Sequence, residues 1–460
     1  MTHPRTITCA AVAAVLLSSP AAFGQLRGFT KITATAEPHL DPQISPDGST
    51  IAFRGSGKIG SVGFLGGPEG AMAVGNNLGD FVWSPSSSGI YYMDGVDLTF
   101  VAKSGGNGLR LTALPGQQHR LWCVDSQDNK VWGTRFEPST NTYHIFTAST
   151  SGAASVDIVS SSTVLDQVRL DPSETRIVYR EALPVPFAPA EVWSANADGT
   201  NPVSLTGGTV ARSIDHLDWV DGGQTVAFTL QSQNTGQVQL GRLATAASST
   251  SIDPLIDMLT EGFLTHRNMA VSADKEWLVH HCQYTASATS TTVAILPSTG
   301  GGRILLARDN KAYILHGPPT IDAANARIAF AASFPVSDGG VPAPPQIYTG
   351  SLDRELRIEP RAELGQSFSV TMPIATNEVG AVFIAAGEAP PLVLPGFAGG
   401  LAVNVPLTLM NGGSSSGELT AALAVPNITS LVGQVLFFQG LRVISLSQGD
   451  FTRLVDVQIF

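Results

Sequence analysis

A short block of apolar, polar and apolar residues, Ile44 to Phe53 (ISPDGSTIAF), sets the hydrophobic pattern of this chain. Its polar centre, Ser45-Pro46-Asp47-Gly48, has the residues of a tight turn: proline presets φ, aspartate bonds its own backbone and glycine accepts the left-handed conformation. The apolar run Ile51-Ala52-Phe53 behind it is typical of a short strand buried on both faces. The block therefore predicts two antiparallel strands joined by a tight turn.

The same ten-residue pattern can be placed on the chain seven times, at intervals of roughly 40 to 50 residues. Its first position is always apolar and its eighth is always aliphatic. The seven copies begin at Ile44, Trp83, Val124, Leu170, Trp219, Val271 and Ile321. Turn-flanked strands at this spacing are typical of the blades of a β-propeller. The repeat predicts an all-β fold whose main part is a seven-bladed β-propeller.

The first and fourth copies resemble a known family. The segments SPDGSTIAF (Ser45 to Phe53) and EVWSANADGTNPVSLT (Glu191 to Thr206) look like the WD-like repeat of TolB-type β-propellers, which has an SPDG turn and later a DG turn followed by Leu-Thr. The resemblance covers about residues 28 to 355 and implies a propeller. In TolB-like relatives the mouth of the central channel accepts a peptide from a partner. Oligogalacturonate lyases are similar in having a propeller of this repeat type with a histidine-rich metal site at the channel.

A segment near the N-terminus offers a way to close the ring. Residues Gly28 to Ala36 (GFTKITATA) alternate as a strand does and precede the first copy, where the outer strand of a blade would end. Pairing of this strand with the seventh blade would remove the sheet edge that an open ring exposes. The alternative is that Ile347 to Leu352 and the residues after it complete the seventh blade alone.

The repeat stops near Glu355, so the propeller is expected to span residues 28–358 and a second unit residues 360–460. The second unit has about six expected strands separated by Gly, Pro and Ser clusters, the size and spacing of a small β-sandwich. The strands are expected at Phe368 to Ile374, Ala381 to Ala386, Leu401 to Met410, Glu418 to Pro426, Gln434 to Ile444 and Thr452 to Phe460. The stretch from Pro406 to Leu441 resembles C-terminal modules of exported proteins from planctomycetes and similar bacteria, and this resemblance implies no function.

Residues 1–24 are typical of a secretory signal, with Arg5 in the first part, an apolar run from Ile7 to Leu17, and Ala22-Phe23-Gly24 as the cleavage site. The apolar run is too short to span a bilayer, and no other long apolar stretch follows it. The mature protein is therefore expected to be exported to the periplasm or the medium, without a transmembrane segment. The net charge is −11 and no basic patch is present, so nucleic acid is not an expected partner.

Histidines stand at constant distances from the repeat. His39, His119, His266 and His316 each stand five residues before their copy, and His216 stands three before its own. The same zone holds acidic and basic residues, namely Asp41, Asp80, Arg120, Asp166, Arg169, Asp218 and Arg267. In a propeller the loops that enter the innermost strands converge on one mouth of the central channel. We call these twelve residues the mouth set and expect them to form one polar site.

The leading hypothesis is an exported binding or scaffold propeller that recognises a protein or peptide, or a carbohydrate, at this mouth, without catalytic residues or a cofactor. Histidine, arginine and aspartate together can bind a carboxylate or a sugar. Two Pro-rich loops, Leu183 to Pro189 and Pro335 to Pro345, would shape the approach to the site. A reading without function is that these side chains satisfy backbone groups where loops enter a crowded channel.

Two other functions stay open. The first is a propeller enzyme of the oligogalacturonate-lyase type, because neutral imidazoles can ligate a transition metal. Its divalent metal would be bound by His39, His119, His266 and His316. The second is a structural component of an exported assembly, attached through residues 360–460.

Overall fold

The structure is a computed structural model that describes residues 29–184, 189–207, 212–232, 238–245, 252–256, 263–284, 291–305, 314–322, 324, 326–333, 343–352, 355–359, 361–392, 394, 397–398, 401–445 and 448–460. The expected signal segment and the central parts of both Pro-rich loops lie outside these residues. The described chain is all-β, and its helical elements are two 3-10 turns, η2 (Asp221–Gly223) and η3 (Thr429–Leu431). In this part of the chain no helix is long and apolar enough to cross a membrane.

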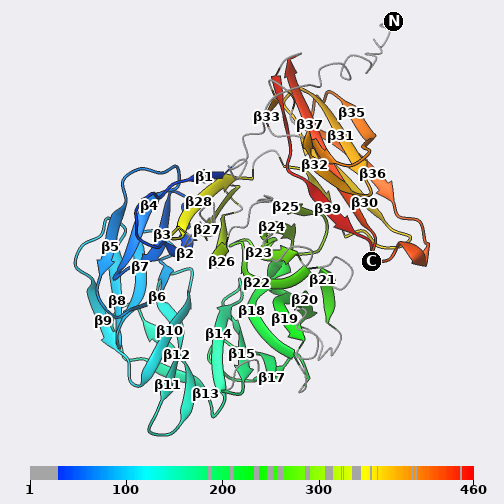
Figure 1. Ribbon diagram of the computed structural model, residues 1–460. Coiled ribbons are helices and arrows are strands. Elements are labelled where there is room, and N and C mark those ends of the chain that lie inside the picture. The colour runs from blue at the N-terminus through cyan, green and yellow to red at the C-terminus, as the bar shows by residue number, and fades with distance from the viewer. Residues whose placement is uncertain are drawn as a thin grey trace, which may run out of the picture.

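Within the described residues, each copy of the repeat lies in its own antiparallel sheet, and seven such sheets follow one another along the chain (Figure 1). We number these sheets 1 to 7. The first strand of each sheet ends at the start of the ten-residue copy, and we call it the inner strand; the fourth strand is called the outer strand. Sheet 1 contains β2 (Leu40–Ile44), β3 (Thr50–Gly55), β4 (Lys58–Gly63) and β5 (Gly70–Val74); sheet 2 contains β6 (Leu78–Trp83), β7 (Gly89–Asp94), β8 (Asp97–Ala102) and β9 (Leu109–Ala113); sheet 3 contains β10 (Gln117–Val124), β11 (Lys130–Glu137), β12 (Thr142–Ser149) and β13 (Val156–Ser161). Sheet 4 contains β14 (Val164–Leu170), β15 (Arg176–Ala182), β16 (Ala190–Asn196) and β17 (Val203–Ser204); sheet 5 contains β18 (Arg212–Val220), β19 (Thr225–Ser232), β20 (Val238–Ala244) and β21 (Asp253–Ile256). Sheet 6 contains β22 (Phe263–Val271), β23 (Trp277–Tyr284), β24 (Thr291–Pro297) and β25 (Arg303–Leu305); sheet 7 contains β26 (Ile314–Asp322), β27 (Arg327–Ser333), β28 (Gln346–Ser351) and β1 (Phe29–Lys31).

The strand register explains why the first and eighth positions of the copies agree. In all seven sheets these two residues are cross-strand partners, as Ile44 is with Ile51 and Trp219 with Val226. The eighth residue is 0% exposed in every copy. Full burial of an aliphatic side chain contributes about 1.5–3 kcal/mol, so this position supplies each sheet with an anchor in the core.

The turn of the copy contains a residue with positive φ, as the sequence predicts for Gly48. The fifth position lies in the left-handed region in each of the six sheets where it is described, with φ between 58° and 87°. Only two of these residues are glycine, and the side chains of the other four contact the preceding sheet, three of them at its turn. Those contacts join Ser87 to Asp47, Asp128 to Ser84, Glu174 to Ser126 and Lys275 to Asp218.

The N-terminal strand closes the succession of sheets. β1 pairs antiparallel with β28, with Phe29 opposite Gly350 and Lys31 opposite Tyr348. Figure 1 shows blue β1 beside yellow β28, and the inner strands β26 and β2 are in contact. This pairing confirms the predicted N-terminal closure, and the alternative in which sheet 7 ends alone is wrong.

The described strands after residue 355 extend sheet 6 and form two separate sheets, of which the smaller pairs β32 with β34. The last strand, β39, pairs with the outer strand β25, and the order then runs β39-β37-β31-β35. The larger separate sheet has the order β29-β30-β36, and Phe368 of β30 meets Phe438 of β37 edge to face at 6.0 Å between ring centroids. The strands are β29 (Arg357–Glu359), β30 (Ser367–Pro373), β31 (Val379–Ala385), β32 (Glu388–Leu392), β33 (Phe397–Ala398), β34 (Leu401–Val403), β35 (Leu407–Gly412), β36 (Glu418–Ala424), β37 (Val435–Ser445), β38 (Gln448–Phe451) and β39 (Val455–Gln458).

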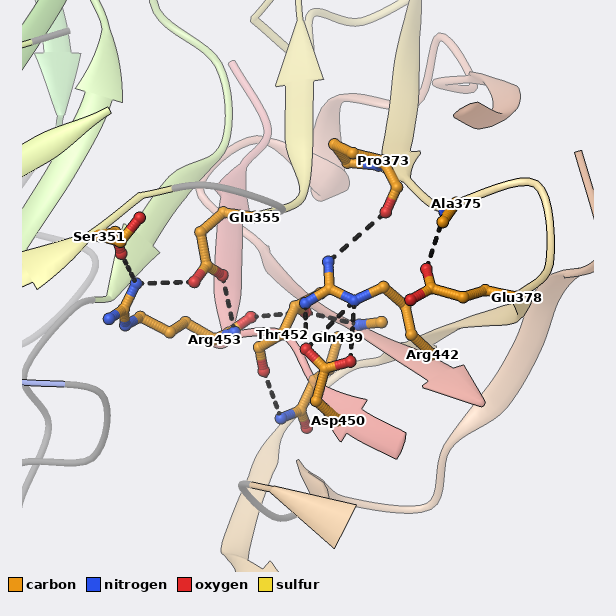
Figure 2. Close-up of polar contacts among 11 residues, drawn as sticks. Ser351, Glu355, Pro373, Ala375, Glu378, Gln439, Arg442, Asp450, Thr452 and Arg453 are labelled. Atoms are coloured by element: carbon orange, nitrogen blue, oxygen red, sulfur yellow. Dashed lines mark hydrogen bonds and ion pairs between the residues drawn. The ribbon is translucent and has the colours of Figure 1, made fainter. Parts of the chain in front are cut away.

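Polar contacts fasten these strands to the repeat sheets. Arg303 of β25 and Asp456 of β39 form an ion pair whose side chains are 4% and 5% exposed, with Arg303 Nε 3.0 Å from Asp456 Oδ1. Figure 2 shows Arg453 donating to the Ser351 carbonyl oxygen at 2.9 Å and to Glu355 Oε1 at 2.7 Å. Burial raises the pKa of Glu355, although the neighbouring Arg453 opposes this shift. The C-terminal strands and sheet 6 are therefore expected to fold as one unit.

Candidate functional site

The mouth set lies within the inner strands. The expectation that these residues occupy the loops before the strands was wrong, except for His39, which stands one residue before β2. The reason is that each inner strand continues through a β-bulge. In all seven sheets the pairing between the first and second strands shifts register at this point. A bulge inserts one extra residue into a strand, so that pairing with the neighbouring strand continues while one side chain points in a new direction. Bulges are frequent beside functional sites.

The bulge explains the identity of one site position. Three residues before the copy, Asp41, Gln167 and His216 have φ of 49°, 56° and 50°. Asparagine, aspartate and histidine tolerate the left-handed region better than most residues do. His216 therefore stands apart from the other four histidines because it occupies a position that the backbone restricts.

The position five residues before the copy faces the packed interior. In sheets 4 and 5 it holds Leu165 and Ile214, which are 2% and 0% exposed. His39 occupies the same position in sheet 1 and is 0% exposed, with Nε2 3.0 Å from Glu69 Oε2. Its ring also packs edge to face on Phe53, at 4.5 Å between centroids.

Two other histidines of this column have local partners. His119 Nε2 lies 2.8 Å from the Pro115 carbonyl oxygen, and His316 Nε2 lies 2.8 Å from Ser333 Oγ. Burial lowers the pKa of both imidazoles. For His266 and Arg267 the structure describes the backbone, within β22, but not the side chains.

The three described histidines of this column do not fit a shared metal ion. His39, His119 and His316 each direct Nε2 at a partner of their own. Among the residues whose side chains are described, no group of three or more His, Cys, Asp or Glu is arranged to hold a metal.

The charged members of the mouth set form a chain of ion pairs across sheets 1 to 3. Arg54 Nε donates to Asp41 Oδ2 at 2.8 Å, and Arg54 Nη1 lies 3.4 Å from Asp80 Oδ1. Asp80 Oδ2 in turn lies 3.2 Å from Arg120 Nε. The side chains of Arg54 and Arg120 are 39% and 54% exposed, and those of both aspartates are 24% exposed. We call Asp41, Arg54, Asp80 and Arg120 the ion-pair chain.

Further pairs extend this arrangement to sheets 4 and 5. Asp166 Oδ1 lies 3.1 Å from Arg180 Nε, and Asp218 Oδ2 lies 3.6 Å from Arg169 Nε. The guanidinium groups of Arg169 and Arg120 both lie over the Trp122 ring, each 5.3 Å from its centroid. Trp122 thus links the ion-pair chain to the inner strand of sheet 4 by cation–π contacts.

Three residues of this region, Arg54, Arg180 and His281, lie outside the mouth set, and the sequence alone favours ordinary packing for the adjacent pair His280 and His281. Each of the three stands directly after its ten-residue copy, so extending the aligned pattern by one residue would have found them. His281 is 5% exposed, and its Nε2 has no hydrogen-bond partner among the described residues. Burial, followed by the nearby His216 and His316, lowers the pKa of His281 to about 3. The structure thus groups His216, His281 and His316 from sheets 5, 6 and 7.

The comparisons with known proteins bear on the fold. No protein-family model matches the sequence, and no curated protein matches it. Among solved structures, the chain is similar to an oligogalacturonate lyase in complex with manganese (14% identity, TM-score 0.56, covering 70% of this chain and 93% of that one). It is also similar to the oligogalacturonate lyase of Vibrio parahaemolyticus (13% identity, TM-score 0.55, covering 70% and 93%). A putative TolB from Agrobacterium tumefaciens has 12% identity and a TM-score of 0.40, covering 71% and 99%. The two lyase structures establish the fold alone, an all-β protein of the β-propeller type.

Proposed function

We propose that sheets 1 to 7 are the blades of one seven-bladed β-propeller, which carries a small sandwich-like unit, residues 360–460, on its sixth blade. The support is one sheet for each copy of the repeat within the described chain, with four strands in six of the sheets and with four repeat strands, β22 to β25, continued by C-terminal strands in sheet 6. The pairing of β1 with β28 supports a closed ring. The signal-like segment 1–24 supports export.

Within this architecture the protein is a non-catalytic binding or scaffold module that recognises a protein or peptide at the mouth. The ion-pair chain is the observation that carries this proposal. Its two arginines are partly exposed, so a carboxylate of a ligand can accept paired hydrogen bonds from them. The aspartates in the chain are already paired with arginine, whereas a general base needs a carboxylate that is placed to receive a proton.

A peptide array tests this proposal. The mature protein, residues 25–460, is expected to bind peptides that carry free carboxylates, and Arg120→Glu should lower the array signal at least tenfold by repelling them. Arg357→Glu is the matched control, because Arg357 is exposed on β29, outside the repeat sheets. Equal signals from both variants, or no bound peptide with the unaltered protein, would contradict the proposal.

A second candidate is a propeller enzyme of the oligogalacturonate-lyase type. The buried, neutral imidazole of His281 near His216 and His316 favours it, because neutral imidazole is the metal-binding form, although the three side chains as described are not arranged to hold a metal ion together. This group shares only His316 with the column expected from the sequence. The test is manganese content by mass spectrometry together with release of unsaturated product from oligogalacturonate. Loss of both in His281→Ala would support the enzyme, and their absence from the unaltered protein would exclude it.

A further inference from the structure

A second polar site lies at the outer side of sheets 1 and 2, away from the inner strands. A cavity of about 590 Å³ opens between β5, the outer strand of sheet 1, and the strands β7, β8 and β9 of sheet 2. Figure 1 shows β5, β8 and β9 together on this outer side. The cavity is large enough for a small-molecule ligand, since such pockets occupy roughly 300–1,000 Å³.

The most buried polar residues of the cavity lining are Tyr92 and Thr99. Tyr92 is 5% exposed and lines the cavity. The Tyr92 hydroxyl makes no hydrogen bond with any residue of the continuously described stretch 29–184. Thr99 beside it is also 5% exposed, and its hydroxyl makes only a long contact of 3.5 Å with the Asp97 carbonyl oxygen. Both residues line the cavity, so their hydroxyls are placed to exchange hydrogen bonds with a ligand there.

Glycine at position 108 keeps the space over these hydroxyls open. A Cβ at Gly108 would lie 2.5 Å from Tyr92 Oη and 2.6 Å from Thr99 Cγ2. Gly105, in the same loop, has a φ of +79°, and a Cβ there would lie 2.6 Å from the Ala71 carbonyl oxygen of β5. The glycines therefore let the loop cross close to sheet 1 without filling the cavity.

The remaining polar lining is close to charge balance. Arg110 Nη2 lies 3.0 Å from Asp97 Oδ1, so these two charges offset each other. Asp94 lines the rim and has no ion-pair partner in residues 29–184. Burial, and then the Asp94 carboxylate, raises the pKa of Tyr92, which keeps its hydroxyl protonated as a donor. β5 also presents the backbone groups of a sheet edge to the cavity.

This mixture of donors and acceptors matches one ligand class. Each hydroxyl of a sugar both donates and accepts a hydrogen bond, as the lining here requires. An anionic ligand would be repelled by Asp94, and Arg110 is already paired with Asp97. A cationic ligand would find the one unpaired carboxylate of this lining, Asp94, at the exposed rim, whereas a neutral hydroxyl can bond to both the rim and the buried hydroxyls. We propose that this cavity binds a neutral sugar of one or two residues, with Tyr92 and Thr99 as its buried contacts and Asp94 and Arg110 at its rim.

Ligand-observed NMR and calorimetry with glucose, galactose, N-acetylglucosamine and cellobiose test the proposal on the mature protein. At least one of these sugars should bind with a saturable Kd, and Tyr92→Phe, which removes only the hydroxyl, should weaken that binding about tenfold or more. Tyr91→Phe is the matched control, because the neighbouring Tyr91 hydroxyl bonds to Asp128 and Thr150 instead of lining the cavity. It should bind the sugar as the unaltered protein does.

A second variant places a methyl group in the cavity. Gly108→Ala should abolish sugar binding without reducing the peptide signal of the channel mouth, and if this variant does not fold, Tyr92→Phe decides. Arg120→Glu should retain sugar binding, which separates this site from the proposed peptide site. The proposal is overturned if none of the four sugars binds, if Tyr92→Phe binds as tightly as Tyr91→Phe, or if methylammonium or acetate binds more tightly than every sugar.

Discussion

Four residues in the turns of the repeat occupy a conformation that favours glycine. Their φ angles lie between 58° and 65°, and the side chain of each contacts the preceding sheet; the four residues are Ser87, Asp128, Glu174 and Lys275. The left-handed conformation costs a non-glycine residue about 1–2 kcal/mol. The inter-sheet contacts offset this cost, so the turn position serves both to reverse the chain and to join neighbouring sheets.

Glu174 allows these two effects to be separated. Glu174→Ala removes the contact with Ser126 and keeps the strained backbone, whereas Glu174→Gly removes the contact and relieves the strain. The glycine variant is therefore expected to be about 1 kcal/mol more stable than the alanine variant, measured by urea denaturation. Equal stability of the two variants would show that the left-handed backbone carries no strain at this position.

His281 predicts a pH dependence of stability. Its native pKa of about 3 lies below the 6.5 of an unperturbed imidazole, so between these pH values the unfolded chain binds a proton that the folded chain does not. The free energy of unfolding should therefore fall as the pH drops from 7 to 5, and the His281 contribution to this fall is about 2 kcal/mol.

The variant His281→Gln should lack that part of the slope. His119 and His316 also have lowered pKa values, so a smaller slope of the same sign should remain. Urea denaturation at pH 7, 6 and 5 compares the two proteins. Parallel pH profiles for the variant and the unaltered protein would contradict the buried, neutral state of His281.

At the scale of strands, the join between β25 and β39 connects segments that are far apart in the chain. Arg303 and Asp456 are cross-strand partners and form an ion pair with both side chains at most 5% exposed. Removing one partner of such a pair leaves a buried charge uncompensated, which typically costs 3–5 kcal/mol, whereas replacing both by apolar residues costs much less.

The prediction is that Asp456→Ala destabilises the protein by about 3–5 kcal/mol, while the double variant Arg303→Met/Asp456→Leu stays within about 1 kcal/mol of the unaltered protein. Thermal and urea denaturation of the full chain measure both changes. If Asp456→Ala alone costs less than about 1 kcal/mol, the pair does not hold the C-terminal strands to sheet 6 in the way described.

At the scale of the whole molecule, the ten-residue hydrophobic pattern predicted the repeat sheets, because equivalent residues stand at the same positions of every copy. The first and eighth positions are apolar in every copy since they are cross-strand partners, and the SPDG turn chemistry is local. The pairing of Arg303 with Asp456 occurs once, across 153 residues, so no repeat could indicate it. Arg54 and His281 lie outside the predicted site for a simpler reason, because each stands one residue beyond its ten-residue copy.

The histidine column shows how spacing alone can mislead. Equal distances from the repeat place residues at equivalent positions of equivalent strands, and in sheets 4 and 5 that position holds Leu165 and Ile214. It is a packing position, and local partners determine how His39, His119 and His316 are used. The ion-pair chain includes Arg54 of β3, which contacts Asp41 of β2. The spacing of residues along the chain does not indicate which side chains of neighbouring strands face each other.

The central claim is that the ion-pair chain recognises carboxylates of a protein or peptide. The most direct measurement is the Kd, by calorimetry, of the strongest array peptide for the unaltered protein and for Arg120→Glu, at low and high salt. Arg120→Glu is expected to weaken binding at least tenfold, about 1.4 kcal/mol, and salt is expected to weaken the binding of the unaltered protein much more than that of the variant. A Kd that is the same for both proteins at both salt concentrations would contradict the central claim.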